Sequence, residues 1–168
     1  MTTDGIKEPL LLTIAVLGGT GKEGKGLAYR WAKAGYKVLI GSRSEERAVT
    51  AASEIMELAE GSTSIVGTSN HEAAQLADIV VLTVPFAAHR ETLESVKDVL
   101  KGKTLIDVTV PLVPPKVTKV QMPSAGSAAQ EAKEIVGEGV EVVAAFHSIS
   151  HEHLLKDDYV ESEVLVTG

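Results

Sequence analysis

The stretch LLTIAVLGGTGKEG, residues 11–24, decides the fold of this chain. Its apolar run predicts a strand over Leu11–Leu17 that ends at Gly18-Gly19, and residues 19–24 match the pattern GxGxxG. Gly19 suits the tight turn, Gly21 the approach of a pyrophosphate to the backbone, and Gly24 the close packing of a helix on the strand. Free amides at that helix start would face the phosphates. A tight turn without a ligand is the alternative interpretation.

Apolar runs and helical patterns alternate along the rest of the chain. Ser44 and Asn70 are the expected caps of two helices, because their side chains can accept exposed amides. Four of the six prolines fall within Val110–Pro123, which predicts irregular structure there. Further strands are expected at Tyr36–Ile40, Ser64–Gly67, Asp78–Val84 in the sheet centre, Thr104–Val108, Val140–Phe146 and Val164–Thr167. Helices are expected around Leu27–Ala34, after Ser44, from Asn70 to Ala77, over Ala88–Leu100 and Ser124–Glu138, and as one turn at His151–Leu155.

This alternation predicts an α/β fold, a doubly wound and mostly parallel sheet of the NAD(P)-binding Rossmann type. The core would be aliphatic, because apolar residues make up 44% of the 168 residues and aromatic residues only 4%. Residues 1–11 are expected to form a loose N-terminal arm, and residues 12–168 the nucleotide-binding domain. Parallel strands buried on both faces read as continuous apolar runs, as they do here.

Composition excludes several classes of function. A net charge of −7 without a basic stretch argues against nucleic acid as a partner. The chain has no cysteine, so a disulfide framework, a thiolate metal site and a cysteine nucleophile are excluded. No apolar run approaches a membrane span, and the polar N-terminus does not resemble a signal peptide. We therefore expect a cytoplasmic protein with no membrane partner.

The end of the second predicted strand favours NADP over NAD. NAD-binding domains place an acidic residue there for the ribose hydroxyls, whereas NADP-binding domains place cations for the 2′-phosphate. This sequence has Ser42 and Arg43 at that point and Arg47 one helical turn later. The planar guanidinium group suits phosphate oxygens. The alternative is two solvated surface arginines, one of them paired with Glu46.

Several motifs together resemble a known family. They are residues 14–21 (IAVLGGTG), 24–28 (GKGLA), 41–43 (GSR), 77–85 (ADIVVLTVP), 111–114 (PLVP), 127–131 (SAAQE) and 145–149 (AFHSI). From about Thr13 to Gly168, the chain is similar to the NADPH-dependent reductases of the deazaflavin coenzyme F420. The resemblance implies a homodimeric oxidoreductase that transfers a hydride between NADP(H) and coenzyme F420.

The resemblance also implies site residues. The nucleotide-binding loop would include Gly18 and Gly19. The pyrophosphate would be held by Thr20, Gly21, Lys22 and Glu23. The 2′-phosphate would be held by Ser42, Arg43 and Arg47. Pro85, Phe86 and Arg90 would lie along the nicotinamide half. His147 and Ile149 match positions that approach the deazaflavin ring, and His151 a further cofactor-lining position. An ordinary polar residue at a strand end is the alternative interpretation of His147.

Two features depart from the family pattern. The family normally continues past the last strand into a helical segment, whereas this sequence ends at Gly168. His151-Glu152-His153 also stands where the family often has small apolar residues. These departures keep two alternatives open: an NADPH-dependent reductase with another acceptor, such as a flavin, a ferric chelate or a small carbonyl or imine, and a non-catalytic NADP-binding module.

Two other polar groups invite a functional interpretation. Asp107 lies at a strand end, where capping of the following loop is the expected role. His147, His151 and His153 with Asp157 and Asp158 do not have the spacing of one complete ligand set, so no metal site is expected.

Overall fold

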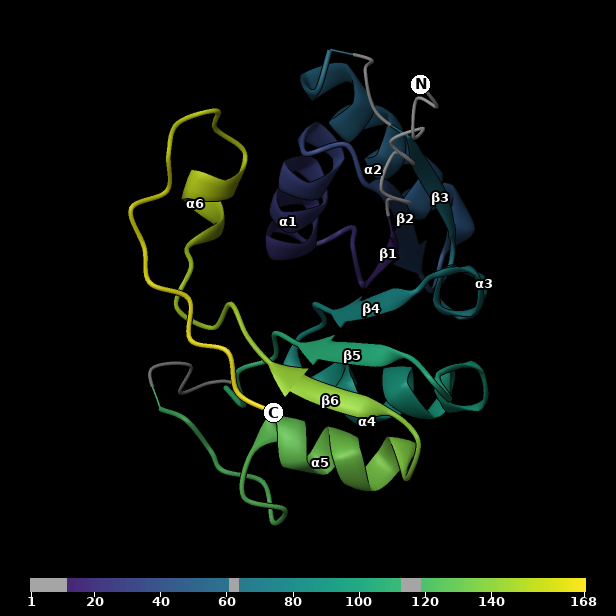
Figure 1. The fold of residues 1–168 in the computed structure, drawn as a ribbon, viewed down its shortest axis with the longest axis vertical. Helices are drawn as coiled ribbons and strands as arrows, with labels where there is room; N and C mark the ends of the chain where they lie inside the picture. Colours follow the sequence, from purple (N-terminus) through teal and green to yellow (C-terminus); the bar gives the residue numbers. More distant parts are fainter. Residues whose placement is uncertain (1–11, 61–63, 113–118) are drawn as a thin grey trace, which may run out of the picture.

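The computed structural model describes residues 12–60, 64–112 and 119–168. The predicted arm, residues 1–11, lies outside the described residues. One sheet of six strands, all parallel, has the order β3-β2-β1-β4-β5-β6. The strands are β1 (Thr13–Leu17), β2 (Lys37–Ser42), β3 (Ile65–Ser69), β4 (Ile79–Leu82), β5 (Thr104–Asp107) and β6 (Glu141–Ala144) (Figure 1). This is the strand order of dinucleotide-binding Rossmann domains, so the predicted fold class is confirmed.

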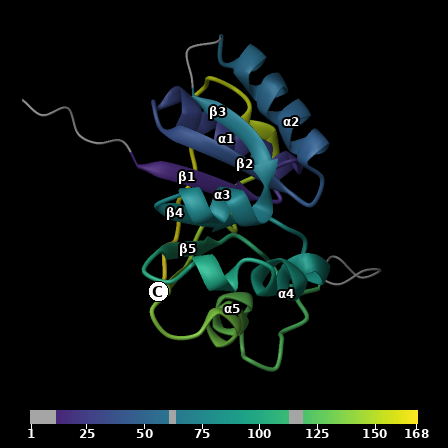
Figure 2. The same ribbon diagram turned by 90° about the vertical axis from the view of Figure 1, so that its right-hand side faces the viewer.

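Helices connect the strands and cover both faces of the sheet (Figure 2). They are α1 (Lys22–Lys33), α2 (Glu45–Leu58), α3 (Asn70–Leu76), α4 (Phe86–Glu94), the 3₁₀ turn η1 (Lys97–Val99), α5 (Ala128–Val136) and α6 (His151–Leu154). Among the described residues, none of these helices has the length and apolar character needed to cross a membrane.

Two aliphatic cores lie on opposite faces of the sheet, because successive strand side chains point in opposite directions. Ile14 and Val16 of β1 pack with α1, α2 and α6 on one face. Ala15 and Leu17 pack with α3, α4 and α5 on the other. β4 lies next to β1 in the middle of the sheet, as its apolar sequence predicted, and Val80, Val81 and Leu82 are fully buried.

The chain reverses its direction of winding between β1 and β4. β1 leads into α1 on one face, whereas β4 leads into α4 on the other. The connections therefore separate above the carboxyl ends of these two strands and leave a crevice, the usual position of ligands in open α/β sheets.

The C-terminal part of the chain returns to α1 after β6 (Figure 1). Arg30 of α1 donates hydrogen bonds to the backbone carbonyl oxygens of His153, Leu154 and Asp158 at 2.8–2.9 Å. The Tyr29 hydroxyl also donates to Asp157 at 2.6 Å. These contacts hold α6 beside α1 and place its first residue, His151, near the amino end of α1.

Several predicted boundaries were wrong. Val164–Thr167 does not form a strand; Thr167 makes an isolated antiparallel bridge with Ala144. The helix expected at Ala88–Leu100 starts at Phe86, after Pro85, and ends at Glu94. The Ser95 hydroxyl donates to the Thr92 carbonyl at 2.7 Å, and such local bonds compete with helix continuation. The helix expected at Ser124–Glu138 is the shorter α5.

The predicted cap at Asn70 was also wrong. Ser69 caps α3, because its hydroxyl accepts the Glu72 amide at 3.1 Å. Asn70 is buried, and its side-chain oxygen accepts the backbone amide of Gly18 at 3.3 Å. A residue expected to serve its own helix therefore supports the glycine loop, 52 positions earlier in the chain. Ser44, by contrast, caps α2 as predicted, with its hydroxyl accepting the Arg47 amide.

Candidate functional site

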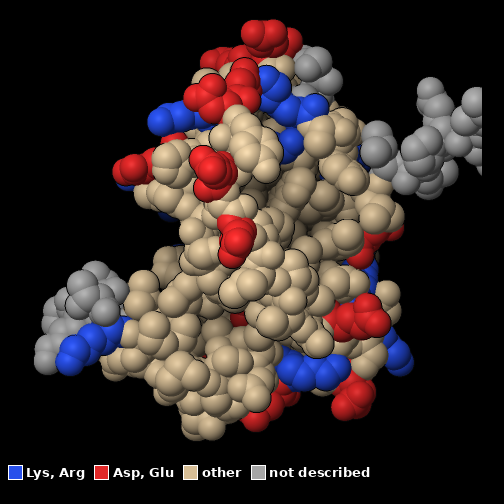
Figure 3. Space-filling model, turned by 60° about the vertical axis from the view of Figure 1, so that its left-hand side comes forward, with Lys and Arg blue, Asp and Glu red and all other residues tan. Residues whose placement is uncertain are grey.

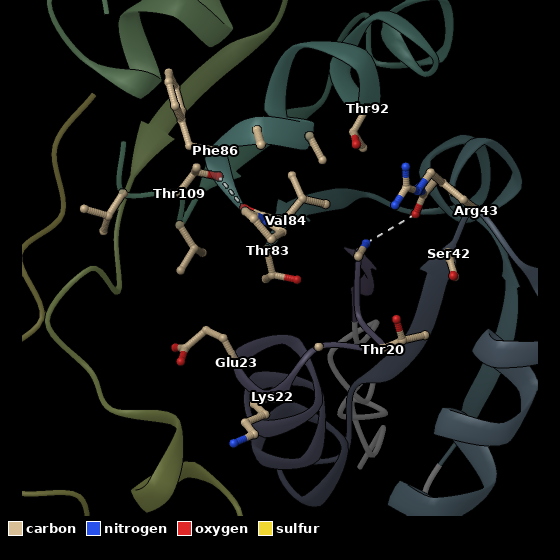
Figure 4. Close-up of a pocket in the computed structure, with 18 of the residues that line it drawn as sticks. Thr20, Lys22, Glu23, Ser42, Arg43, Thr83, Val84, Phe86, Thr92 and Thr109 are labelled. Atoms are coloured by element: carbon tan, nitrogen blue, oxygen red, sulfur yellow. Dashed lines mark hydrogen bonds between the residues drawn. The ribbon is translucent and has the colours of Figure 1, made fainter. Parts of the chain in front are cut away.

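A cleft of about 720 Å³ opens above the carboxyl ends of β1, β2 and β4 (Figure 4). Most of the residues predicted to bind the nucleotide line it. These are Gly18, Thr20, Gly21, Lys22, Glu23, Ser42, Arg43, Arg47, Pro85 and Phe86. The fold thus brings together segments that are more than 60 residues apart in the sequence.

The glycine loop has little room for side chains except where it faces the cleft. A Cβ atom on Gly24 would lie 2.7 Å from both Gly19 Cα and Thr83 Oγ1, so the helix approaches the strands as closely as the motif predicts. A Cβ atom on Gly21 would meet only the Gly18 carbonyl oxygen, at 3.5 Å. Gly21 therefore exposes its backbone to the cleft, and a ligand can approach that backbone closely.

Two helices begin at this cleft without a side-chain cap. Gly21 precedes α1 and Pro85 precedes α4, and neither offers a capping hydrogen bond. The other α-helices are each capped by a serine, namely Ser44, Ser69, Ser127 and Ser150. The first amides of a helix have no intrahelical acceptor, and they carry the positive end of its dipole. The uncapped starts of α1 and α4 therefore suit a phosphate-bearing ligand.

Hydroxyl and guanidinium groups gather at the β2 end of the cleft. The Ser42 side chain is buried, and its oxygen accepts the Ser44 amide at 3.2 Å. Arg43 is exposed, and its Nη1 atom lies 4.0 Å from Oε2 of Glu91 in α4. Arg47 is exposed on the first turn of α2. A weak exposed ion pair would yield readily to a phosphate group.

Apolar groups and hydroxyls form the opposite end of the cleft. Phe86 and Pro85 follow β4, and Thr109 follows β5. The Thr109 hydroxyl donates to the Val84 carbonyl at 3.3 Å (Figure 4), which ties the two strand ends together. Glu23 lies at this end as well. Burial raises the pKa of its carboxyl group above the ordinary value, and the nearby charge of His151 opposes that effect.

Four other predicted site residues do not line the cleft, namely Gly19, His147, Ile149 and His151. His147 is exposed and lines a neighbouring groove of about 1000 Å³, which shares Thr109 and Val110 with the cleft. Phe146, directly before it, has a positive φ of 66° and packs its ring edge on Trp31. Ile149 is half-buried against the core beside α1. Among the described residues, no group of three or more potential ligands is arranged to hold a metal ion.

The structure directs Arg90 away from the cleft. Its guanidinium lies 3.3 Å from Glu131 of α5 and 3.9 Å from Glu94 of its own helix. It does not line the cleft. Contact with a nicotinamide would therefore require Arg90 to give up both partners.

A buried polar cluster below the cleft was missed from the sequence. His89 of α4 is fully buried, with Nε2 2.9 Å from Asp107 and Nδ1 3.3 Å from Glu131. The His89 ring also lies beside the Phe86 ring, with centroids 5.6 Å apart. His89 stands four residues before the buried Leu93, so helical spacing could have indicated its inward direction. Its partners, 18 and 42 residues away, carry no local signal.

Asp107 has the capping role that was predicted for it. Its Oδ1 accepts the Thr109 amide at 2.9 Å, while Oδ2 faces His89. The carboxylate is completely buried. The cluster of His89, Asp107 and Glu131 therefore holds the loop that forms one wall of the cleft, without itself facing the cleft.

Comparisons with known proteins agree with this geometry. The family model for NADP oxidoreductase, coenzyme F420-dependent, matches residues 13–111. The chain is 45% identical to the F420-dependent NADP reductase of Methanothermobacter marburgensis, over 86% of this chain and 66% of that protein. It is 43% identical to the F420-dependent NADP reductase of Methanothermobacter thermautotrophicus, over 95% of this chain and 71% of that protein. The chain thus spans about two thirds of the length of these relatives.

Solved structures show the same fold at lower sequence identity. A candidate F420-dependent NADP-reductase from Arthrobacter sp. FB24 superimposes with a TM-score of 0.70 at 23% identity, over 84% of this chain and 65% of that chain. A reductive aminase from Aspergillus terreus superimposes with a TM-score of 0.61 at 16% identity, over 84% of this chain and 43% of that chain. These likenesses concern the fold; the match to the family model and the identity to the curated relatives show that this chain belongs to the family of coenzyme F420-dependent NADP oxidoreductases.

Proposed function

We propose that this chain binds NADP and transfers a hydride between NADP(H) and coenzyme F420. The observation that carries the proposal is the cleft itself. It joins an open glycine backbone, two uncapped helix starts and two arginines beyond the second strand, in a chain of the matching family. The glycine backbone and the start of α1 suit the pyrophosphate, and the two arginines suit the 2′-phosphate. The start of α4 lies at the end that is left for the nicotinamide.

NADP would lie across the carboxyl ends of the strands. Ser42, Arg43 and Arg47 would bind the 2′-phosphate, since they are the hydroxyl and cationic groups at that end of the cleft. The pyrophosphate would lie against Gly21 and the first amides of α1. The nicotinamide would then reach the end formed by Pro85, Phe86 and Thr109. Bound there, the nicotinamide supplies the hydride chemistry, and the chain supplies orientation and exclusion of water.

Coenzyme F420 would approach from the adjoining groove. That groove joins the cleft at Thr109 and Val110 and carries His147 on its wall. The exposed imidazole of His147 can donate a hydrogen bond to a carbonyl oxygen of a ring that lies there. Ile149 and His151 do not line this groove; on the side toward α1 they would provide an apolar contact and a further polar group. A correctly held pair of rings gains much of its rate from proximity and orientation alone.

The proposal includes a homodimer in the cytoplasm. Uncharged side chains cover most of the face that carries the C-terminal segment (Figure 3). Several apolar side chains on or beside the groove are exposed, among them Met122 at 64% and Leu165 at 76%. Apolar surface of this kind is typical of protein–protein contacts. Light scattering after size-exclusion chromatography would give a mass of twice 17.7 kDa for the dimer.

The decisive experiment mixes purified protein with NADPH and oxidised coenzyme F420 and follows the absorbance of the deazaflavin. Loss of that absorbance only in the presence of protein is the expected result. A parallel titration of protein with NADPH reports binding by itself. Binding without turnover would contradict the reductase proposal and favour a nucleotide-binding module. Turnover with a flavin, ferric chelate or imine in place of coenzyme F420 would identify another acceptor.

A further inference from the structure

Glu23 carries a buried oxygen that the protein does not use. Its Oε1 atom is shielded from solvent and has no hydrogen-bond partner among the described residues. Buried polar atoms nearly always have partners, so this exception requires an explanation. The atom belongs to the first turn of α1, and its residue lines the cleft. A ligand in the cleft could therefore supply the missing donor.

The place of Glu23 along the cleft identifies which part of the ligand it would meet. Figure 4 shows Glu23 on the side of Thr83 and Thr109, whereas Ser42 and Arg43 lie at the other end. A dinucleotide whose 2′-phosphate lies at Arg43 must cross the glycine loop before it reaches Glu23. The half of the ligand at Glu23 is then the nicotinamide with its ribose.

The chemistry of the two ligand halves agrees with this placement. A phosphate offers no donor and repels a carboxylate, so the Glu23 side chain does not suit the pyrophosphate, although its backbone amide does. The nicotinamide carries a carboxamide with two N–H donors. The neighbouring hydroxyls of Thr83 and Thr109 already donate their protons to the carbonyl oxygens of Leu17 and Val84.

We propose that the Glu23 carboxyl group accepts a hydrogen bond from the carboxamide N–H of NADP and so recognises the nicotinamide end of the cofactor. This inference rests on the proposed function, because it takes NADP as the ligand of the cleft. It assigns Glu23 a role in distinguishing the complete dinucleotide from fragments that lack the base.

Calorimetric titration of three proteins with three ligands tests the proposal. The proteins are wild type, Glu23→Gln and Glu23→Leu; the ligands are NADP, 2′-phospho-ADP-ribose and the 3-acetylpyridine analogue of NADP. Glu23→Leu should weaken NADP binding about three- to tenfold, the usual value of one lost hydrogen bond. Glu23→Gln keeps an acceptor oxygen and should stay within about twofold of wild type.

The two other ligands separate recognition from folding. 2′-Phospho-ADP-ribose lacks the nicotinamide, so all three proteins should bind it within about twofold of one another. The acetylpyridine analogue lacks the N–H donors, so wild type and Glu23→Leu should bind it alike. Equal losses of NADP and 2′-phospho-ADP-ribose, or no loss of NADP in Glu23→Leu, would overturn the role of Glu23. Wild type that binds neither NADP nor 2′-phospho-ADP-ribose would instead refute the proposed function.

Discussion

Two polar clusters lie at the carboxyl edge of the sheet, one after β2 and open to the cleft, the other at the end of β5 and closed beneath the cleft. The open cluster of Ser42, Arg43 and Arg47 has two exposed arginines, and the ion pair from Arg43 to Glu91 is loose, at 4.0 Å. In the closed cluster, His89 contacts both Asp107 and Glu131 through its two ring nitrogens. The side chains of His89 and Asp107 are completely buried from solvent. Charged groups that remain without close partners are available to a ligand, whereas buried polar groups that bond to one another serve the fold.

We therefore expect substitutions in one cluster to change nucleotide affinity and substitutions in the other to change the stability of the fold. Changes at the two exposed arginines of the open cluster should alter affinity at nearly constant stability, because surface substitutions seldom affect unfolding. Changes in the closed cluster should alter stability first, because a buried charge would lose its partner.

Replacement of His89 should break the closed cluster. His89→Leu leaves the buried Asp107 carboxylate without its side-chain partner, and we expect the free energy of unfolding to fall by about 3–5 kcal/mol. Urea unfolding of wild type and variant measures the difference. Asp107→Asn in the same background removes the unpaired charge while an oxygen can still accept the Thr109 amide, so it should recover part of the loss. A loss below about 1 kcal/mol in His89→Leu would show that the cluster does not support the fold.

Replacement of both arginines should break the open cluster. Arg43→Ala combined with Arg47→Ala removes two charged donors, and NADP affinity should fall at least about a hundredfold. NAD lacks the 2′-phosphate, so its affinity should change by no more than about twofold. Fluorescence titration with each nucleotide measures both values, and urea unfolding should match wild type within about 0.5 kcal/mol. Equal losses for NADP and NAD would contradict the assignment of the 2′-phosphate.

Substitutions of two glycines in the same loop should likewise separate an effect on stability from an effect on nucleotide affinity, with smaller changes in each. Gly24→Ala places a Cβ atom 2.7 Å from Gly19 Cα and should destabilise the protein by about 1–3 kcal/mol. Gly21→Ala places its Cβ atom toward the cleft and should preserve stability, while affinity for NADP and NAD falls together by about tenfold, or 1.4 kcal/mol. Thermal unfolding and nucleotide titration of both variants compare them. Unchanged nucleotide affinity in Gly21→Ala would refute backbone approach at this position.

Glu23 shares a feature with each cluster, because it is partly buried and its Oε1 atom has no hydrogen-bond partner in the described part of the chain. Its raised pKa means that the folded protein holds the proton more tightly than the unfolded chain. Stability is therefore lost as pH rises from the ordinary pKa of 4.5 through the raised folded value. Glu23→Gln should accordingly raise the melting temperature relative to wild type at pH 8, by a larger margin than at pH 4.

An exposed glutamate on the next helix provides the control for this pH effect. Glu57→Gln on α2 should give the same small difference in melting temperature at both pH values. A difference for Glu23→Gln that grows as the pH falls would have the wrong sign and would refute the effect of burial.

The sequence allowed the fold and most of the cleft to be predicted. The apolar runs of β1, β2 and β4, separated by helical patterns, favour parallel strands, because helices on both sides of a parallel sheet bury both faces of each strand. The glycine loop and Arg43 lie directly after two of those strands, so chain position alone brings them to the same edge of the sheet. Local sequence patterns were sufficient to predict the position of a residue wherever its own strand or helix determines that position.

Tertiary structure decided the pairs that are distant in sequence. Ser69 and Asn70 both suit a helix cap, and only the position of the Gly18 amide, 52 residues away, determines that Ser69 caps while Asn70 supports the loop. His89 and Asp107 likewise have no local reason to meet. Whether a polar side chain faces a ligand, a partner or solvent depends on what the fold places within hydrogen-bonding distance, and residues near it in the sequence do not carry that information.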